Sequence, residues 1–304
     1  MQGRLLFVSH IPVRLPAEKF YHQEKTVDEY EDTLNGHVRM SAPRMIDTHT
    51  HLCDPVFDDD RDEVLQSARK DGVVSILTVS ETLEDAKKNR ALSKRYPMLY
   101  SLAGLYPTHL DFDRVEAMIT FIRENRDRFV GIGEVGLDFW TIKEAAKQAI
   151  QREIFIRFIQ LSEELSLPLN VHSRSAGRHA IELLLKHDAK KVQLHAFDGK
   201  ASTALPAVEA GFYFSIPPSI VRSRQKQRLV KHLPLSCILV ETDSPVLGPV
   251  PGERNEPKHI SKAVNNIADI KEITREEVME TTFHNTLRLY GNNIFQDMTS
   301  SIIA

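Results

Sequence analysis

Short apolar runs rich in β-branched residues alternate with longer segments of helical period from residue 45 onward. Apolar runs of this length predict buried strands, and their alternation with amphipathic helices is typical of parallel βα units. The pattern predicts eight strands, which cover residues 45–49, 73–79, 99–105, 129–134, 167–172, 191–195, 211–216 and 237–242. We therefore expect an α/β protein with a parallel sheet.

Eight βα units over roughly 245 residues suit a closed (β/α)₈ barrel, the TIM barrel, better than an open doubly wound sheet. No Gly-x-Gly-x-x-Gly turn follows the first strand, so a dinucleotide-binding fold lacks its main sequence support. Near the end of the chain, Thr274 and Glu277 have the spacing of a capping box and predict the start of a last helix. In such a barrel the active site forms at the carboxyl ends of the strands, the C-terminal face.

The chain divides into three parts by its patterning. Residues 1–43 lack sustained apolar periodicity, and we expect them to be a disordered extension or the product of an alternative start, with Met45 as a second start site. The first seventeen residues contain Arg4 and Arg14 and no acid, which permits organelle targeting, but acidic residues follow soon after and disfavour it. We expect the barrel domain over residues 44–291 and a C-terminal tail over 292–304.

Composition narrows the class of protein. Of 304 residues, 41% are hydrophobic and 27% charged, as in soluble globular proteins, and no apolar run approaches the roughly 20 residues that span a bilayer. The two cysteines, Cys53 and Cys237, are too few for a disulfide framework, so we expect a reducing compartment, the cytoplasm or nucleus. A net charge of −3 disfavours a surface that wraps nucleic acid, so any polyanion contact must be local.

Six polar residues stand where apolar runs stop: His49, His51, Glu134, His172, His195 and Asp243. His49 and His51 lie on one face of the first strand, because side chains alternate with a period of two. A lone His-x-His is a weak motif, and each other histidine alone is better explained as a satisfied polar residue. Together, four histidines and two carboxylates at one barrel mouth require a cation, since the carboxylates would otherwise repel each other.

Imidazole nitrogens with carboxylate oxygens suit transition-type divalent ions better than Ca²⁺, which takes only oxygens. Six ligands are too many for one open tetrahedral site, whereas a pair of ions about 3.5–4 Å apart uses them and leaves a position for water. We expect two divalent metal ions, Mg²⁺, Mn²⁺ or Zn²⁺, whose identity the sequence leaves open. Such a pair lowers the pKa of water, which indicates a hydrolase.

These motifs also carry a family resemblance. From about Met45 to Tyr290 the chain resembles the TatD family of metal-dependent deoxyribonucleases in the amidohydrolase superfamily. The matching segments, in family order, are Ile46–Leu52, Gly133–Asp138, Val171–Arg174, His195–Gly199, Glu241–Pro245 and Arg254–Pro257. The stretches Asn170–Gly177 and Phe214–Ser219 are most similar to the third TatD domain-containing subgroup.

The resemblance implies a role for each of the six residues. It implies that His49, His51 and Asp243 bind one ion, that His172 and His195 bind the second, and that Glu134 bridges them. It also implies that Asp243 orients the attacking water and receives its proton, which makes Asp243 and Glu134 the catalytic residues. The chain departs from the family at Gly104–Pro107 and at Ala196 and Asp198, which puts substrate preference in doubt but removes no predicted ligand.

Substrate contacts are predicted less directly. Arg174 lies two residues beyond His172 and is expected to bind a phosphate oxygen, the alternative being a salt bridge to a barrel carboxylate. Arg254 is a weaker phosphate-binding candidate in the loop after the eighth strand. The basic run over residues 222–228 indicates a solvated helix face or a nucleic-acid contact. Phe139 and Trp140 indicate either base stacking or core packing.

Three functions remain open at this stage. The first is a nuclease that hydrolyses phosphodiester bonds, with DNA or another phosphodiester bound locally and no membrane partner. The second is a metal-dependent ester or amide hydrolase, for example of an aminoacyl ester on RNA. The third, a scaffold with a structural metal, fits poorly, because a structural site is closed and needs fewer ligands. The oligomeric state is not predictable from the sequence.

Overall fold

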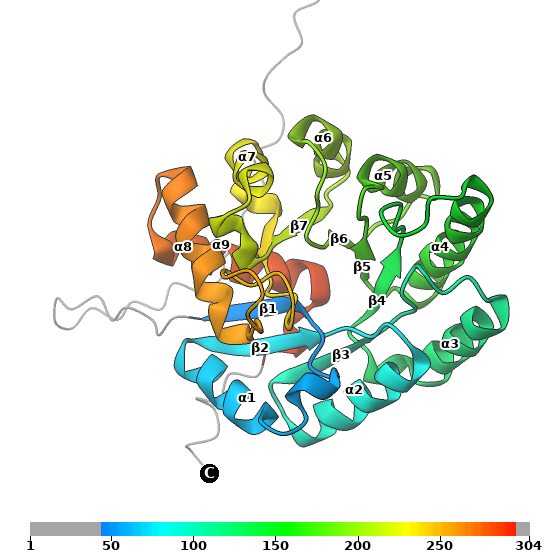
Figure 1. The fold of residues 1–304 in the computed structure, drawn as a ribbon, viewed down its shortest axis with the longest axis horizontal. Helices are drawn as coiled ribbons and strands as arrows, with labels where there is room; N and C mark the ends of the chain where they lie inside the picture. Colours follow the sequence, from blue (N-terminus) through cyan, green and yellow to red (C-terminus); the bar gives the residue numbers. More distant parts are fainter. Residues whose placement is uncertain (1–43, 296–304) are drawn as a thin grey trace, which may run out of the picture. The chain divides into compact units, whose positions relative to one another are not determined.

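The computed structural model describes residues 44–295, so the predictions for residues 1–43 and 296–304 lie outside the described residues. Eight parallel strands follow one another in chain order around one sheet (Figure 1). They are β1 (Met45–Thr50), β2 (Val73–Thr78), β3 (Leu99–Ala103), β4 (Gly131–Gly136), β5 (Leu169–His172), β6 (Val192–Leu194), β7 (Tyr213–Ile216) and β8 (Ile238–Val240). The eight predicted strands are all present.

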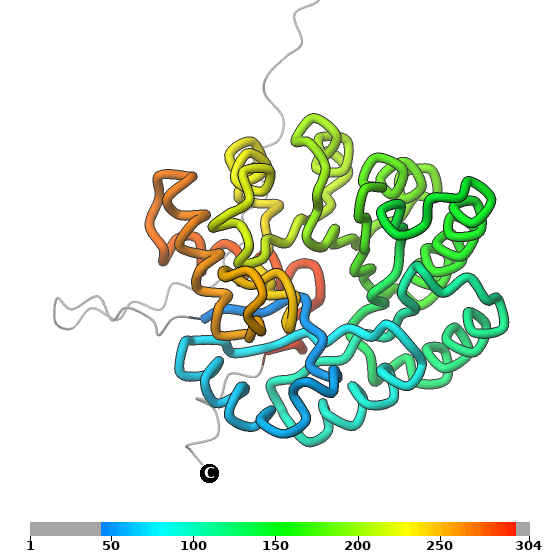
Figure 2. Tube along the Cα trace, in the orientation of Figure 1, coloured from blue at the N-terminus to red at the C-terminus, as the bar shows by residue number. Residues whose placement is uncertain are grey.

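Helices follow the strands and cover the outside of the sheet (Figures 1 and 2). They are α1 (Arg61–Lys70), α2 (Leu83–Arg95), α3 (Phe112–Glu124), α4 (Ala145–Leu165), α5 (Gly177–Lys186), α6 (Ala201–Glu209), α7 (Arg224–His232), α8 (Ile260–Lys271) and α9 (Arg275–Tyr290). As predicted, α9 begins at Thr274, whose hydroxyl accepts a hydrogen bond from the Glu277 amide at 3.1 Å. None of the helices within residues 44–295 is long and apolar enough to cross a membrane.

The first and last strands lie side by side and nearly close the sheet. The Thr48 hydroxyl donates to the Val240 carbonyl at 2.9 Å, and the Asp243 amide donates to the His49 carbonyl at 2.8 Å. The Thr242 amide donates to the buried carboxylate of Asp47 at 2.9 Å. The predicted (β/α)₈ barrel is thereby confirmed, and the contacts hold the ends of β1 and β8 together at its mouth.

Several strands end earlier than the apolar pattern predicts. The third was expected to reach residue 105 and the eighth residue 242, whereas β3 ends at Ala103 and β8 at Val240. After β8 the chain leaves extended geometry, because Asp243 has a φ of 54° in the left-handed region. The apolar pattern predicts which residues are buried, and residues stay buried beyond the last hydrogen bond between neighbouring strands. The pattern therefore overestimates the length of these strands.

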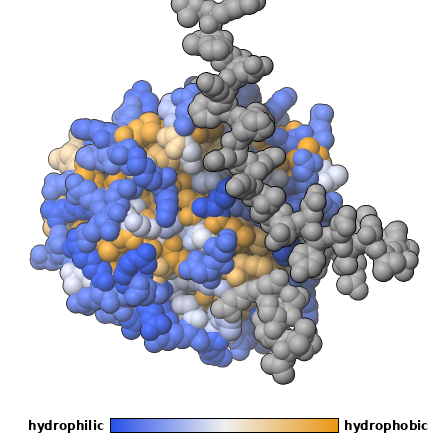
Figure 3. All heavy atoms as spheres, turned by 180° about the vertical axis from the view of Figure 1, so that it is seen from behind, coloured by the Kyte–Doolittle hydropathy of each residue, from blue (hydrophilic) through white to orange (hydrophobic). Residues whose placement is uncertain are grey.

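The C-terminal helix α9 contacts the interior of the barrel. Tyr290 of α9 is buried, and its hydroxyl donates to Gln193 at 2.7 Å and accepts from the Asn170 amide at 3.2 Å. The short helix η6 (Asn292–Ile294) follows, and the Ile294 carbonyl accepts from the Ser75 hydroxyl at 2.6 Å. Residues 292–295, placed in the tail by sequence, thus belong to the packed body. Seen from the opposite side to Figure 1, hydrophilic residues cover most of the rim (Figure 3).

Candidate metal centre

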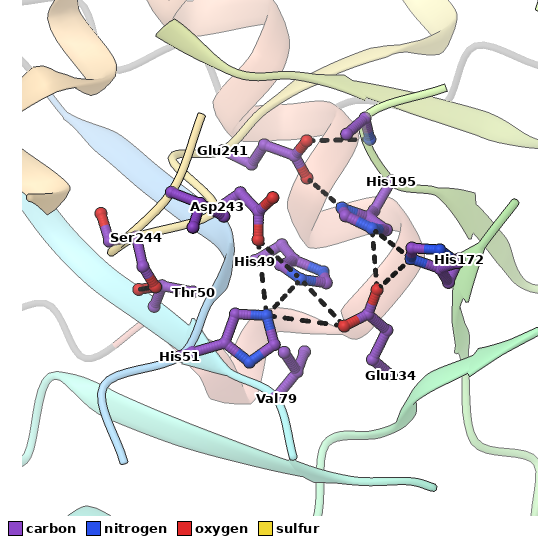
Figure 4. Close-up of polar contacts among 12 residues, drawn as sticks. His49, Thr50, His51, Val79, Glu134, His172, His195, Glu241, Asp243 and Ser244 are labelled. Atoms are coloured by element: carbon purple, nitrogen blue, oxygen red, sulfur yellow. Dashed lines mark hydrogen bonds and ion pairs between the residues drawn. The ribbon is translucent and has the colours of Figure 1, made fainter. Parts of the chain in front are cut away.

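The fold brings all six predicted ligands together at the carboxyl ends of the strands (Figure 4). His49 and His172 lie within β1 and β5, Glu134 within β4, and His51, His195 and Asp243 directly beyond β1, β6 and β8. All are buried except His51, whose side chain is 12% exposed. Residues more than 190 positions apart in the sequence, such as His49 and Asp243, therefore share one small volume.

Glu134 stands between two groups of ligands and directs one oxygen at each. Its Oε1 lies 2.6 Å from Nδ1 of His172 and 2.9 Å from Nε2 of His195. Its Oε2 lies 3.8 Å from Nε2 of His49 and 3.5 Å from Nε2 of His51. Oδ1 of Asp243 lies 3.4 Å from both of these nitrogens. The arrangement offers two adjoining positions for a cation, joined by one carboxylate.

A hydrogen bond fixes which nitrogen of His49 faces the site. The Asn170 amide nitrogen donates to the Thr48 carbonyl at 3.0 Å, so the Asn170 carbonyl oxygen is directed at Nδ1 of His49, 2.8 Å away. Nδ1 must then be the donor, and Nε2 presents its lone pair to the other ligands. A ligating histidine that donates its second nitrogen to a fixed acceptor is the usual arrangement at metal sites.

Two of the other histidines face carboxylates at longer range. Nε2 of His172 lies 3.4 Å from Asp138, and Nδ1 of His195 lies 3.7 Å from Glu241. Burial alone would raise the pKa of Asp138, but His172 and the Thr141 amide lower it below its usual range, so the carboxylate is charged. These carboxylates leave Nδ1 of His172 and Nε2 of His195 directed at Glu134.

The site has the chemical features that a cation would satisfy. Oδ1 of Asp243 is buried and has no hydrogen-bond donor among the described residues. Burial alone would lower the pKa of His51, but Asp243, Glu134 and Glu81 together raise it to about 9. Burial would likewise raise the pKa of Glu134, yet His195 and His172 hold it well below its usual range. The negative field that attracts protons in this way suits a divalent cation.

Close packing and a turn place the acidic ligands. A Cβ on Gly133 would lie 2.6 Å from Cβ of Asn170, so only glycine lets β4 approach β5 this closely. Asp243 adopts a left-handed φ, a conformation that is costly for a residue other than glycine. The hydrogen bond from the backbone amide of Asp243 to the His49 carbonyl holds Asp243 in place.

A pocket of about 440 Å³ opens over the ligands and brings further charged residues to them. The additional residues in its wall include Glu81, Tyr106, Ser173, Arg174, Asp198 and Lys226. Arg174 is exposed, makes no ion pair among the described residues, and lies 5.2 Å from the ring of Trp140. Trp140 is 57% exposed, whereas Phe139 is part of the core, so only Trp140 is accessible for stacking.

Arg254 lies elsewhere. Its guanidinium pairs with both carboxylate oxygens of Asp60 and, at 2.9 Å, with Glu256, and it stacks on Phe57. It is not among the residues that line the pocket. The predicted phosphate contact therefore receives no geometric support, because the charge of Arg254 is already matched by two acids.

Sequence reasoning missed a layer of polar residues directly beneath the ligands. Asp47, Asn170, Gln193 and Glu241 are all fully buried and each precedes a ligand by two positions. In an extended strand a spacing of two puts both residues on one face, and Asp47, Asn170 and Gln193 lie within β1, β5 and β6, whereas Glu241 directly follows β8. In the sequence, these residues could have been recognised as polar positions that interrupt an apolar run two positions before a predicted ligand.

Comparisons with known proteins identify the family of the chain. A family profile described as TatD related DNase matches residues 46–291. Deoxyribonuclease TATDN3 of Homo sapiens is 45% identical over 265 residues, which cover 83% of this chain and 97% of the relative. The chain belongs to the TatD family. The metal-dependent hydrolase YabD of Bacillus subtilis, a further relative, is 31% identical and is covered in full by the alignment, which spans 82% of this chain.

Solved structures of TatD proteins have the same architecture. The TatD homologue YjjV of Escherichia coli superposes with a TM-score of 0.77 at 25% identity, over 82% of this chain and 99% of YjjV. A TatD family hydrolase of Entamoeba histolytica gives a TM-score of 0.75 at 22% identity, over 82% and 98% of the two chains. As a TatD family member with these clustered ligands, the chain is a metal-dependent hydrolase.

Proposed function

We propose that this chain is a deoxyribonuclease that cleaves phosphodiester bonds at a site for two divalent ions. The observation that carries the proposal is the placement of Glu134, with one carboxylate oxygen toward His49 and His51 and the other toward His172 and His195. The printed name of the human relative, a deoxyribonuclease, supports DNA as the substrate.

The residues divide naturally between the two ions. His49, His51 and Asp243 would hold one, His172 and His195 the other, and Glu134 would bridge them. Bound there, divalent cations lower the pKa of a water and stabilise charge on a phosphoryl group. Asp243 would orient the attacking water and accept its proton. The hydrogen bond from its backbone amide to the His49 carbonyl, which holds Asp243 at the site, supports this role.

Lys226 favours a phosphodiester over a carboxylic ester. This lysine of α7 is 7% exposed, lines the pocket, and donates one hydrogen bond to the Ala196 carbonyl at 2.8 Å. An ammonium has three donors, so two remain for an anionic group in the pocket. Together with Arg174, it gives the pocket two cations that a neutral ester would not need.

The direct test is cleavage of end-labelled single-stranded DNA by purified protein with Mg²⁺ or Mn²⁺. We expect product with the wild type and none above background with Glu134→Ala. Equal cleavage by the two proteins would contradict the proposal. The runner-up, an ester or amide hydrolase, is favoured instead if ester turnover far exceeds DNA turnover and Arg174→Ala leaves it unchanged.

We place the protein in a reducing compartment, the cytoplasm or the nucleus. Cys53 and Cys237 support this placement because both are free and buried. Fractionation of the native cells would test it, and recovery of the protein in a secretory or extracellular fraction would contradict it.

A further inference from the structure

A second cavity opens beside the catalytic pocket, between helices α6 and α7, which lie next to each other in Figure 1. It measures about 800 Å³ and is lined by the loop 198–200, by Ala201, Ser202 and Leu205 of α6, and by Gln225, Arg228, Leu229 and His232 of α7. Asp198 lines both cavities, so the α6–α7 groove begins where the catalytic pocket ends.

The floor of the groove is apolar and partly open to solvent. Leu205 is 48% exposed, and it shares the groove with Ala201 and Leu229. Lys200 and Arg228 stand exposed at its edges. An apolar floor between two cations suits a ligand with flat rings and negative charge, which is the chemistry of a nucleotide.

The charge of this region is opposite to that of the whole chain. Residues 198–235, which include the groove, contain six lysines and arginines and two acids, Asp198 and Glu209, although the net charge of the chain is −3. None of the six takes part in an ion pair with another described residue. They are Lys200, Arg222, Arg224, Lys226, Arg228 and Lys231. Unpaired positive charge gathered on one side is an electrostatic footprint for a polyanion.

Helix α7 connects the groove to the metal centre. Lys226 turns inward and lines the catalytic pocket, whereas Arg228, two positions later, lines the groove. The Gln225 side chain donates to the Gly199 carbonyl at 2.6 Å and so fixes the loop that separates the two cavities. A strand bound at the metals and passing Asp198 would meet positive charge on both sides of this loop.

We propose that the α6–α7 groove binds a nucleotide of the single-stranded substrate adjacent to the phosphodiester that is cleaved, with its base on the apolar floor and its phosphate at Arg228 and Lys200. This inference rests on the proposed function, because it assumes that the scissile bond lies over Glu134. A groove at this position would confine nucleic-acid binding to the α6–α7 side of a protein whose net charge is negative.

The test compares Arg228→Glu with Arg128→Glu, a matched charge reversal. Arg128 is also exposed, but it precedes β4 and therefore lies at the opposite end of the barrel. We expect Arg228→Glu to raise KM for a single-stranded oligonucleotide about tenfold and to weaken its salt dependence. Turnover of bis(4-nitrophenyl) phosphate, too small to reach the groove, should be unchanged in both variants.

Equal KM values for the oligonucleotide in the two variants would overturn the groove and leave the nuclease intact. If the wild type cleaves neither substrate, the proposed function fails. A binding measurement with single-stranded DNA then tests the groove independently of cleavage. Fluorescence anisotropy of labelled single-stranded DNA then supports the groove if Arg228→Glu alone weakens binding. It overturns the groove if the two variants bind equally.

Discussion

At the residue scale, the proposed metal ligands depend on neighbouring polar side chains that fix their orientation. Asn170 directs Nε2 of His49 into the site, and Asp138 does the same for Nδ1 of His172. These partners touch no substrate in our account and act by fixing the ligand nitrogens. Their removal should therefore affect metal affinity before it affects the fold.

We predict that Asn170→Ala weakens Mn²⁺ binding about 10–100-fold, because His49 loses the acceptor that fixes its tautomer. Isothermal titration calorimetry measures this directly. Gln193→Ala is the matched control, since Gln193 lies in the same buried layer but bonds Thr48 and Ser215 rather than a ligand imidazole. Equal losses of affinity in both variants would show that the layer acts only through stability.

We predict that Lys226→Gln lowers kcat/KM for DNA roughly 10–100-fold, the usual effect of losing a charge-assisted hydrogen bond. The amide of glutamine can still donate toward Ala196, so the loop 195–198 should keep its position. Steady-state kinetics on DNA and the Tm of the variant separate the two roles. An unchanged kcat/KM, or a loss that comes with a lower Tm, would assign Lys226 to structure and not to phosphate binding.

At the element scale, strand spacing sets the distance between ligands. Glu134 and His172 come from the adjacent strands β4 and β5, which can approach closely because Gly133 has no side chain. Each strand contributes its ligand at or just beyond its carboxyl end. A change in the separation of two strands therefore acts on the metal centre directly.

We predict that Gly133→Ala destabilises the protein by about 1–3 kcal/mol, because the added methyl group meets the Asn170 side chain. It should also impair metal binding, since β4 and β5 must separate. Urea denaturation with and without Mn²⁺ measures both effects. Gly131→Ala, in the same strand, meets neighbours only at 3.0 Å or more and should be milder. The reverse order would contradict the packing argument.

The strands and the six clustered residues could be predicted because both follow from local pattern. Apolar runs identify buried strands, and a polar residue at the end of each run lies at the mouth of the barrel. Lys226 and Arg254 could not be placed in this way. A basic residue in a helix or loop has the same sequence pattern whether it enters a pocket, as Lys226 does, or meets an acid 194 positions away, as Arg254 does.

At the scale of the whole molecule, the metal centre ties together strands from both ends of the barrel. The proposed ligands come from β1, β4 and β5 and from the segments that follow β1, β6 and β8. Without a cation, the buried carboxylates of Glu134 and Asp243 form ion pairs only with imidazoles among residues 44–295. Ion binding should therefore stabilise the entire barrel.

We predict that saturating Mn²⁺ raises Tm by about 5–10 °C over EDTA-treated protein, the shift expected for about 2.7 kcal/mol in a domain of this size. Differential scanning calorimetry measures it. His284→Ala, which removes a histidine outside the metal centre, should show the same shift as the wild type. An unchanged Tm with excess ion would mean that the ligands do not form a binding site.

The most direct measurement for the central claim is a titration of metal-free protein with Mn²⁺, in which bound ion and DNA cleavage are followed on the same samples. Two ions held by a shared Glu134 predict saturation at two equivalents per chain, with most activity appearing between the first and the second. Glu134→Gln should then bind ion more weakly and lose at least about a hundredfold in kcat. Full activity at one equivalent, or full activity in Glu134→Gln, would contradict the account.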